Sequence, residues 1–235
     1  MVRLLRLSGT SGRALDLGCG TGSMAAHLAT LGFSVWALDP SLGCTELTRR
    51  MADARGLSRQ VRVVAARGED LPLPDKYFDV AMCGEVLEHV ENDRRAVGEI
   101  ARVLRPGGAF IVTVPADEWR FDSCDQWAGH RRRYSEETLR ELCQSAGLRV
   151  IWLQRWGFPL GTLYDRLVFK PYVRRLPRME RTGAGSTGGL TLGGVLHALG
   201  RTPGIAWAVA QSFRVDDLFA GLGRGSSILL LAQRS

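Results

Sequence analysis

The chain has 235 residues, of which 45% are hydrophobic and 23% are charged, and its formal net charge is +7. This composition is that of a folded globular protein, and it excludes a disordered chain and a collagen-like repeat. Only two of the 31 basic residues are lysines, which fits either a coding sequence rich in G and C or an anionic partner such as a membrane or a nucleic acid. Five cysteines without a CxxC spacing argue against a disulfide framework and favour a reducing cytosol. The first residues lack the apolar core of a signal peptide, and no run reaches the ~18 apolar residues that span a bilayer.

Short apolar runs alternate with helical patterns along the first 155 residues, and one further apolar run lies near the end of the chain. This alternation predicts an α/β fold with a mostly parallel sheet covered by helices on both faces. The expected strands are Arg13–Gly18, Phe33–Leu38, Val61–Ala65, Phe78–Cys83, Ala109–Val114, Leu148–Leu153 and Ser227–Ala232. The expected helices are Gly22–Leu31, Leu42–Arg55, Asn92–Leu104 and Glu136–Ala146.

Three glycines at alternate positions follow the first expected strand, in the sequence DLGCGTG that begins at Asp16. They let the backbone approach a ligand closely, and the helix that follows offers N–H groups to an anion. In an open parallel sheet this turn lies at the carboxyl edge, where ligands bind. Asp39 ends the second expected strand, where a carboxylate can accept hydrogen bonds from ribose hydroxyls. The loop also matches a dinucleotide fingerprint, Gly20-x-Gly22-x-x-Ala25, so two kinds of nucleotide cofactor remain open.

The chain resembles class I S-adenosylmethionine-dependent methyltransferases over about residues 12–155. The resemblance rests on four segments in the family's order: ALDLGCGTG (14–22), GEDLPLPDKYFDVAMCGEVLEHV (68–90), LRPGGAFIVTVP (104–115) and GHRRRYSEETL (129–139). It implies a Rossmann-like sheet of seven strands with the last one antiparallel. It also implies a set of residues that hold S-adenosylmethionine, namely Asp16, Gly18, Cys19, Gly20, Gly22, Asp39, Pro40, Glu69, Asp70, Leu71 and Glu85.

A cluster of acidic residues and histidines follows the fourth expected strand. Glu85, Glu88 and His89 fall within one turn, and His130 lies in a loop that is also expected at the carboxyl edge. This arrangement resembles two methyltransferase groups that use a metal, the ubiquinone-pathway catechol-type enzymes and the small-RNA 2′-O-methyltransferases. Three interpretations stay open. The four residues can bind a divalent metal such as Mg²⁺, Mn²⁺ or Zn²⁺; Glu85, His89 and His130 can be catalytic with a histidine as general base; or the cluster can be structural.

Basic and aromatic side chains surround His130 in the sequence. Arg131, Arg132 and Arg133 follow it, and they are either a solvated loop or a contact for an acidic acceptor or for the carboxylate of the cofactor. Nearby aromatic residues either line an acceptor pocket or cover the edge of the sheet; they are Trp119, Phe121, Trp127 and Tyr134.

A long segment separates the last two expected strands. We therefore divide the chain into a cofactor-binding core (1–155), an insertion or cap (156–225) and a final strand that completes the core (226–235). In the insertion, apolar residues follow a helical pattern from Leu160 to Val168, and Arg155–Arg181 carries a net charge of +5. This region can contact an anionic membrane, act as a lid or a dimer interface, or pack on the core with a solvated basic face.

These observations predict a bacterial, cytoplasmic S-adenosylmethionine-dependent methyltransferase (EC 2.1.1.-). We expect O-methylation of a small or lipid-like acceptor, no nucleic-acid partner, and peripheral contact with the inner face of the membrane through residues 156–181. The alternatives are an NAD(P)-dependent oxidoreductase and a non-catalytic module that binds a cofactor or RNA.

Overall fold

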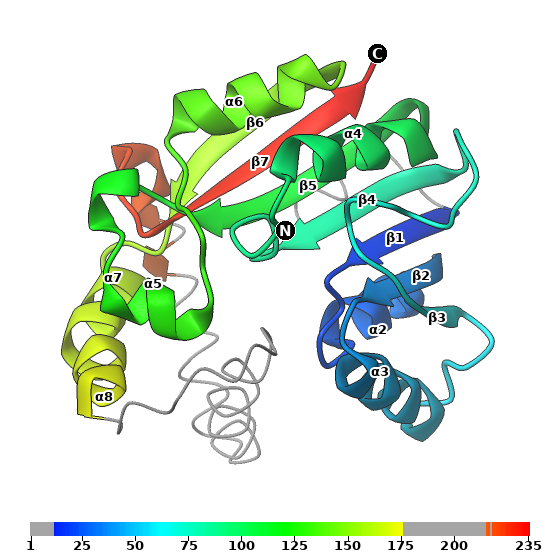
Figure 1. Ribbon diagram of the computed structural model, residues 1–235, viewed down its shortest axis with the longest axis horizontal. Helices are drawn as coiled ribbons and strands as arrows, with labels where there is room; N and C mark the ends of the chain where they lie inside the picture. Colours follow the sequence, from blue (N-terminus) through cyan, green and yellow to red (C-terminus); the bar gives the residue numbers. More distant parts are fainter. Residues whose placement is uncertain (1–11, 176–214, 217) are drawn as a thin grey trace. The chain divides into compact units, whose positions relative to one another are not determined.

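The computed structural model describes residues 12–175, 215–216 and 218–235 (Figure 1). They belong to two compact units. The first unit takes its residues from Met1–Val114, Glu136–Leu153 and Leu229–Ser235, and the second from Pro115–Ser135 and Gln154–Ile228. The loop that carries His130 therefore belongs with the insertion. The domain boundaries expected after residues 155 and 225 stay predictions.

A seven-stranded sheet forms the first unit, with the strand order β3-β2-β1-β4-β5-β7-β6. β1 pairs in parallel with both β2 and β4, and the last strand, β7, is antiparallel. The connections change direction between β1 and β4, which is the place where open α/β sheets bind ligands at the carboxyl ends of their strands. The strands are β1 (Arg13–Leu17), β2 (Ser34–Asp39), β3 (Val61–Ala65), β4 (Phe78–Gly84), β5 (Leu104–Pro115), β6 (Leu148–Trp156) and β7 (Ser227–Arg234).

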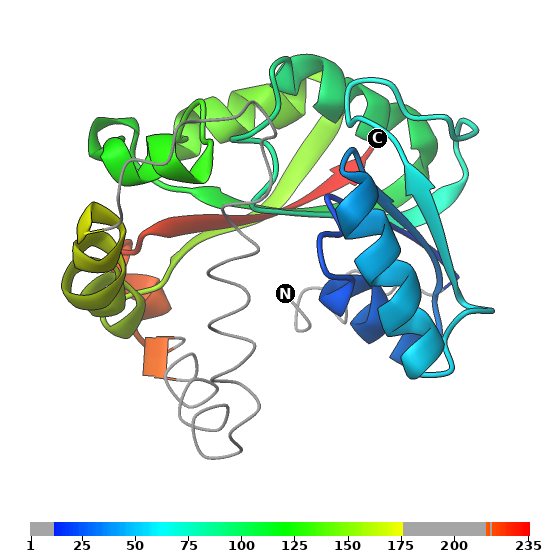
Figure 2. The same cartoon turned by 60° about the horizontal axis from the view of Figure 1, so that its bottom comes forward.

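Helices cover both faces of this sheet. Figure 2 shows α2 and α3 on one face and α4 and α6 on the other. Ser41 accepts a hydrogen bond from the Cys44 N–H at the start of α3, and Asn92 accepts one from the Arg95 N–H at the start of α4, so polar N-cap residues fix where these helices begin. The bounds are α2 (Ser23–Thr30), α3 (Leu42–Ala54), α4 (Asp93–Val103) and α6 (Glu136–Ser145).

The core of the first unit is made by the central strands. Leu15, Phe78, Phe110 and Ile111 are completely buried, and burial of side chains of this size stabilises the fold by roughly 1.5–3 kcal/mol each. The loops at the carboxyl edge are therefore held by a well-packed sheet.

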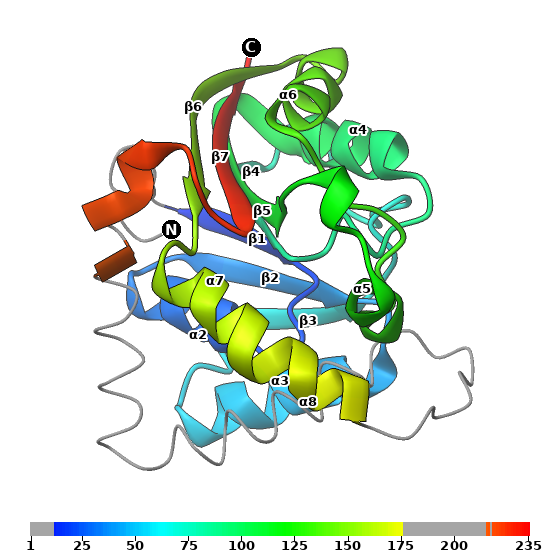
Figure 3. The same ribbon diagram turned by 90° about the vertical axis from the view of Figure 1, so that its left-hand side faces the viewer.

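The described residues of the second unit are mostly helical. It contains η1 (Glu118–Arg120), α5 (Ser123–Ala128) and η3 (Ala220–Leu222), and α7 (Leu160–Tyr164), the π-helical η2 (Asp165–Phe169) and α8 (Lys170–Arg175) follow one another along one axis (Figure 3). The buried carboxylate of Asp216 accepts hydrogen bonds from the N–H groups of Leu160 and Gly161 at 2.7 and 2.9 Å. It satisfies the N–H groups that the start of α7 would otherwise leave unpaired.

The expected fold class is confirmed, and the expected elements of the core lie within a few residues of the observed ones, except at β5. This strand begins at Leu104 instead of Ala109, because Phe78 pairs with Leu104 and Val80 pairs with Ala109, so that four residues bulge opposite Asp79. The segments Gly183–Gly194 and Gly204–Phe213 lie outside the described residues. Among the described residues, no helix combines the length and the hydropathy needed to cross a bilayer.

Candidate active site

The glycine loop connects β1 to α2 at the carboxyl edge of the sheet. Gly18, Gly20 and Gly22 have φ angles of 73°, 52° and 80°, a region that residues with a Cβ rarely adopt. A Cβ on Gly22 would lie 2.5 Å from Cε of Met51, whereas a Cβ on Gly20 would meet nothing within 4 Å. Gly22 is therefore required for packing, while Gly20 leaves its backbone open to an approaching ligand.

Asp39 joins the end of β2 to this loop. Its carboxylate oxygens accept hydrogen bonds from the N–H groups of Gly20 at 3.0 Å and Ser41 at 2.9 Å. A carboxylate oxygen has more than one acceptor site, so these bonds orient the group and leave capacity for the two hydroxyls of a ribose. Pro40 follows it in an exposed position.

Asp16 and Cys19 are buried beneath the loop. Only 3% of Asp16 is exposed, and its Oδ2 atom has no hydrogen-bond partner among the described residues. Burial raises the pKa of Asp16 to about 7; the N–H of Ala25 opposes this and the charge of Asp39 adds to it. Burial likewise raises the pKa of the Cys19 thiol, to about 12. The unpaired oxygen of Asp16 fits a cationic group of a bound ligand, whereas Cys19 contributes packing and no thiolate.

The predicted adenine segment, Glu69–Leu71, is held by residues that the sequence did not identify. Leu71 is buried, and its N–H donates to Glu99 at 2.9 Å while its carbonyl accepts from Arg102 at 2.9 Å. Arg102 also binds Glu99 and the carbonyl of Leu73. Its hydrogen bond to Glu99 is the main cause of the lowered pKa of that carboxyl. Asp70 is exposed and Glu69 lies 3.6 Å from Arg67, so the segment is fixed from α4 through its backbone.

The turn after β4 contains Glu85, Glu88 and His89, as the sequence predicts. Glu85 has a φ of 55°, and its N–H donates to the carbonyl of Thr113 on β5 at 2.9 Å. Such a conformation costs about 1–3 kcal/mol, and strain of this kind is commonly found at functional sites. Glu88 is completely buried, while Glu85 is exposed. Burial is the main cause that raises the pKa of the Cys83 thiol well above its ordinary value, and the charges of Glu88 and Asp16 add to it.

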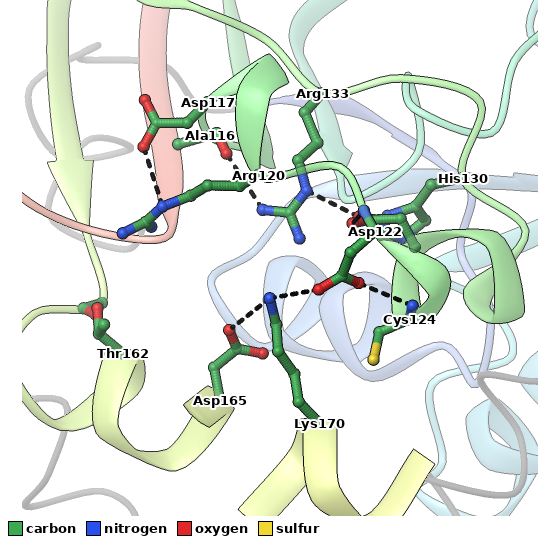
Figure 4. A network of polar contacts seen from close by, with 12 residues as sticks. Ala116, Asp117, Arg120, Asp122, Cys124, His130, Arg133, Thr162, Asp165 and Lys170 are labelled. Carbon is green, nitrogen blue, oxygen red and sulfur yellow. Dashed lines mark hydrogen bonds and ion pairs between the residues drawn. The ribbon is translucent and has the colours of Figure 1, made fainter. Parts of the chain in front are cut away.

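His130 lies in the second unit, so each unit holds part of the predicted catalytic set. Its Nδ1 atom lies 2.8 Å from Oδ1 of Asp125. Arg133 is not available to an acceptor, because it donates to Asp125 at 2.8 Å and to the carbonyl of Ala116 at 3.1 Å. Arg131 is exposed. Figure 4 shows His130 and Arg133 in a network of polar contacts that also includes Lys170.

The aromatic residues around His130 play different roles. Tyr134 is buried, and Trp127 packs against Phe169 with 6.4 Å between ring centroids. Trp119 is 79% exposed, and Arg120 stacks on it with its guanidinium carbon 5.1 Å from the ring centroid. Tyr134 and Trp127 are thus structural, and Trp119 is open to a ligand or a partner.

The glycine loop, the acidic residue at the end of β2 and the change of direction between β1 and β4 together define a cofactor-binding domain of the Rossmann-like class. Residues 15–112 match the family described as "Methyltransferase domain". This region therefore matches a methyltransferase domain, and the match supports the class I S-adenosylmethionine-dependent methyltransferase that the motifs predict.

Relatives and solved structures agree with this assignment. The chain is 36% identical over 115 residues to a sarcosine/dimethylglycine N-methyltransferase of Aphanothece halophytica, which covers 48% of this chain and 40% of the relative. It is 32% identical over 154 residues to the O-methyltransferase resE of Aspergillus sclerotiorum, covering 62% and 58%. The chain thus spans about half the length of these relatives.

Two solved structures share the fold over nearly the whole chain. A geranyl diphosphate methyltransferase in complex with S-adenosylmethionine has a TM-score of 0.62 at 17% identity and covers 96% of this chain and 79% of its own. The [4+2]-cyclase SpnF has a TM-score of 0.64 at 25% identity and covers 99% and 80%.

Proposed function

We propose that this protein transfers a methyl group from S-adenosylmethionine to a hydroxyl group of a small-molecule or lipid-like acceptor. The observation that carries the proposal is the glycine loop tied to Asp39, with the unpaired buried carboxylate of Asp16 beneath it. The loop, Asp16 and Asp39 hold the aminocarboxypropyl and ribose parts of the cofactor, and the backbone-anchored segment at Leu71 holds the adenine. When bound, S-adenosylmethionine supplies a methyl group that is already activated by a positive sulfur.

The residues of this chain then have two tasks, which are to align the acceptor and to remove its proton. Acidic side chains at the ends of β1, β2 and β4, including Asp16, Asp39 and Glu85, favour a cationic cofactor electrostatically. Alignment of the reacting atoms is the main requirement of such a transfer. A hydroxyl acceptor also needs a base, and His89 and His130 are our candidates.

A metal is the other way to activate the hydroxyl. The adjacent Glu88 and His89 are of the residue types that bind Zn²⁺, Mn²⁺ or Mg²⁺, and Glu88 is a completely buried carboxylate. In this form of the proposal Glu85 and His130 complete the set of ligands. EDTA would then abolish transfer and added metal would restore it, while binding of S-adenosylhomocysteine persists. Full activity in EDTA would exclude the metal and leave a histidine base.

The first experiment is equilibrium binding together with a labelled-methyl transfer screen on cell extract. We expect S-adenosylhomocysteine to bind and NAD(P) not to bind. Binding of NAD(P) alone would favour an oxidoreductase, which the comparisons do not support. Cofactor binding without any transfer would favour a non-methyltransferase activity, since the cyclase SpnF has the same fold. Salt-dependent RNA affinity without transfer would favour an RNA-binding module.

A lipid-like acceptor is supported by the exposed apolar face of α7 and η2. Leu163, Leu167 and Val168 are 50%, 66% and 52% exposed. Of the three alternatives for this segment, these exposures disfavour packing on the core and are compatible with a contact surface. We propose that this face, with the basic residues of 156–181, contacts an anionic membrane surface. Wild-type protein should sediment with anionic vesicles at low salt, and Leu167→Glu should abolish this. Leu42→Glu, at an exposed leucine of α3 in the first unit, is the matched control. Absence of sedimentation at low salt would contradict membrane contact.

We propose a cytoplasmic location from the state of the cysteines. All five are buried and free of disulfides, which fits a reducing cytosol. Cell fractionation of the source organism, which we expect to be a bacterium, tests this assignment.

A further inference from the structure

The carboxylate of Asp125 in α5 makes polar contacts through both of its oxygens. Its Oδ2 accepts the N–H of Asp122 at 2.9 Å, which closes a capping box at the start of α5. Its Oδ1 lies 2.8 Å from Nδ1 of His130 and accepts the Nε–H of Arg133 at 2.8 Å. Only 2% of Asp125 is exposed. The side chain is therefore fixed from three directions.

The hydrogen bonds of Asp125 determine what it can do to His130. Both oxygens of this carboxyl group already accept N–H groups, Oδ1 from Arg133 and Oδ2 from Asp122. A carboxylate held in this way by N–H donors only accepts hydrogen bonds. The Nδ1 atom of His130 must therefore carry a proton, and in the neutral ring the lone pair is then on Nε2.

The backbone also ties the two residues together. The N–H of His130 donates to the carbonyl of Asp125 at 2.8 Å. Gly129, which lies between them in the sequence, ends α5 in a left-handed conformation with a φ of 82°. Asp125 in α5 thus holds His130 through its backbone carbonyl and through its side chain. The ring of His130 cannot turn without breaking its hydrogen bond to Asp125.

We propose that Asp125 is a positioning residue that fixes the tautomer and the direction of His130, so that Nε2 is the atom that acts on the acceptor. Arg133 holds Asp125 in place. The inference rests on the proposed function of His130, as a general base or as a metal ligand. Carboxylates that orient a histidine in this way are known from both kinds of site. Their loss costs about 10–100-fold in activity or metal affinity at metal sites, and up to about 10⁴-fold in kcat beside a histidine base.

The neighbouring Asp122 provides a matched control. It belongs to the same capping box, accepting the N–H of Cys124 at 2.7 Å, and it pairs with Lys170 at 2.7 Å. Its carboxylate contacts Cys124 and Lys170, whereas the carboxylate of Asp125 contacts His130. A role in α5 alone would therefore make Asp122→Asn and Asp125→Asn equally harmful, whereas the positioning role predicts that they differ.

The experiment compares these two variants by kinetics and by ¹⁵N NMR of the histidine rings. His130→Gln identifies the His130 signals among the four histidines. In the wild type, at a pH where the ring is neutral, we expect the Nδ1–H tautomer. Asp125→Asn should shift the tautomer, because an amide can donate to Nδ1. It should lower kcat by about 10–100-fold if His130 binds a metal, and by up to about 10⁴-fold if His130 is the base. KM for S-adenosylmethionine should stay within about threefold. Asp122→Asn should keep both the tautomer and kcat.

The outcomes distinguish failure of the role of Asp125 from failure of the proposed role of His130. An Nε2–H tautomer in the wild type overturns the inference, even if neither variant folds. So does an equal loss of kcat in both variants, or an unchanged kcat in folded Asp125→Asn. If His130→Gln keeps full turnover, the proposed role of His130 is wrong, whatever the tautomer shows.

Discussion

The buried carboxyl group of Asp16 should make the stability of the protein fall as the pH rises from about 4 to 7. Its pKa is raised from the ordinary value of 3.8 to about 7. Between these two values the unfolded chain has lost the proton and the folded protein retains it. Raising the pH in this window therefore favours the unfolded state, and above pH 7 this contribution no longer changes. In Asp16→Asn the contribution is absent at every pH.

The magnitude follows from the size of the shift. At about 1.36 kcal/mol per pKa unit, a rise from 3.8 to about 7 corresponds to about 4 kcal/mol over the whole window. Between pH 5 and pH 8 the same arithmetic gives about 3 kcal/mol. Urea unfolding of both proteins without cofactor at these two pH values measures it. Other titrating groups act equally in both proteins, so the quantity to report is how the difference between them changes with pH.

The result that would refute this reasoning is a difference that stays constant from pH 5 to pH 8. Asp16 would then be ionised throughout, and burial would not control its charge. The cofactor provides a second test. A cationic amino group prefers the ionised carboxylate, so affinity for S-adenosylhomocysteine should rise with pH up to about 7 in the wild type, by at most about tenfold per unit. In Asp16→Asn this dependence should be lost.

Three further predictions concern the cofactor. Asp39→Ala should weaken binding of S-adenosylhomocysteine by roughly tenfold to over a hundredfold, since a hydrogen bond to a charged group is worth about 1.5–3 kcal/mol. The control is Glu46→Ala, at an exposed residue of α3. If calorimetry gives the two variants the same affinity, Asp39 lies outside the site. Gly20→Ala should weaken binding and destabilise the fold only by the strain of its left-handed backbone, because its Cβ would enter open space; Gly22→Ala has the same backbone strain and should destabilise the fold more, because its Cβ would also crowd Thr48 and Met51. The reverse order in urea unfolding would contradict this. Deletion of Gly183–Gly194 should leave cofactor affinity nearly unchanged, since all the predicted cofactor residues lie before residue 116, and a large loss would place this segment in the cofactor site.

The sequence predicts the first unit well because its signals are local. β3 is found over the expected residues Val61–Ala65, since a short apolar run between turns is unambiguous. Asp39 is predicted from its place at the end of an expected strand, and Asp16 from the resemblance of the glycine motif to the methyltransferase family. The bulge at Arg105–Gly108 is not predicted, because it depends on how β5 pairs with a strand that lies more than 20 residues earlier.

The interactions that support the site are less predictable. Glu99 and Arg102 have the spacing of an ion pair on a helix, but nothing in that spacing shows that they also hold the backbone of Leu71. α5 has only six residues, which is too short for a periodic pattern, so Asp125 was not singled out. Its role depends on contacts that form only when the loop closes on itself.

The comparisons show why the acceptor has to be sought in the second unit. The relatives include an N-methyltransferase and an O-methyltransferase, and each matches only about half to three fifths of this chain. A region that is shared by enzymes with different acceptor atoms cannot specify the acceptor, and residues 15–112 are the part that matches the family. The residues that remain include the whole of the second unit, with the Asp125–His130 pair, the exposed Trp119 and the apolar face at Leu167. A hydroxyl acceptor needs a base, and an acceptor of low solubility needs an apolar surface. The candidate base His130 and the apolar face at Leu167 belong to the second unit, so we expect that exchanging this unit between relatives changes the acceptor while cofactor affinity stays the same.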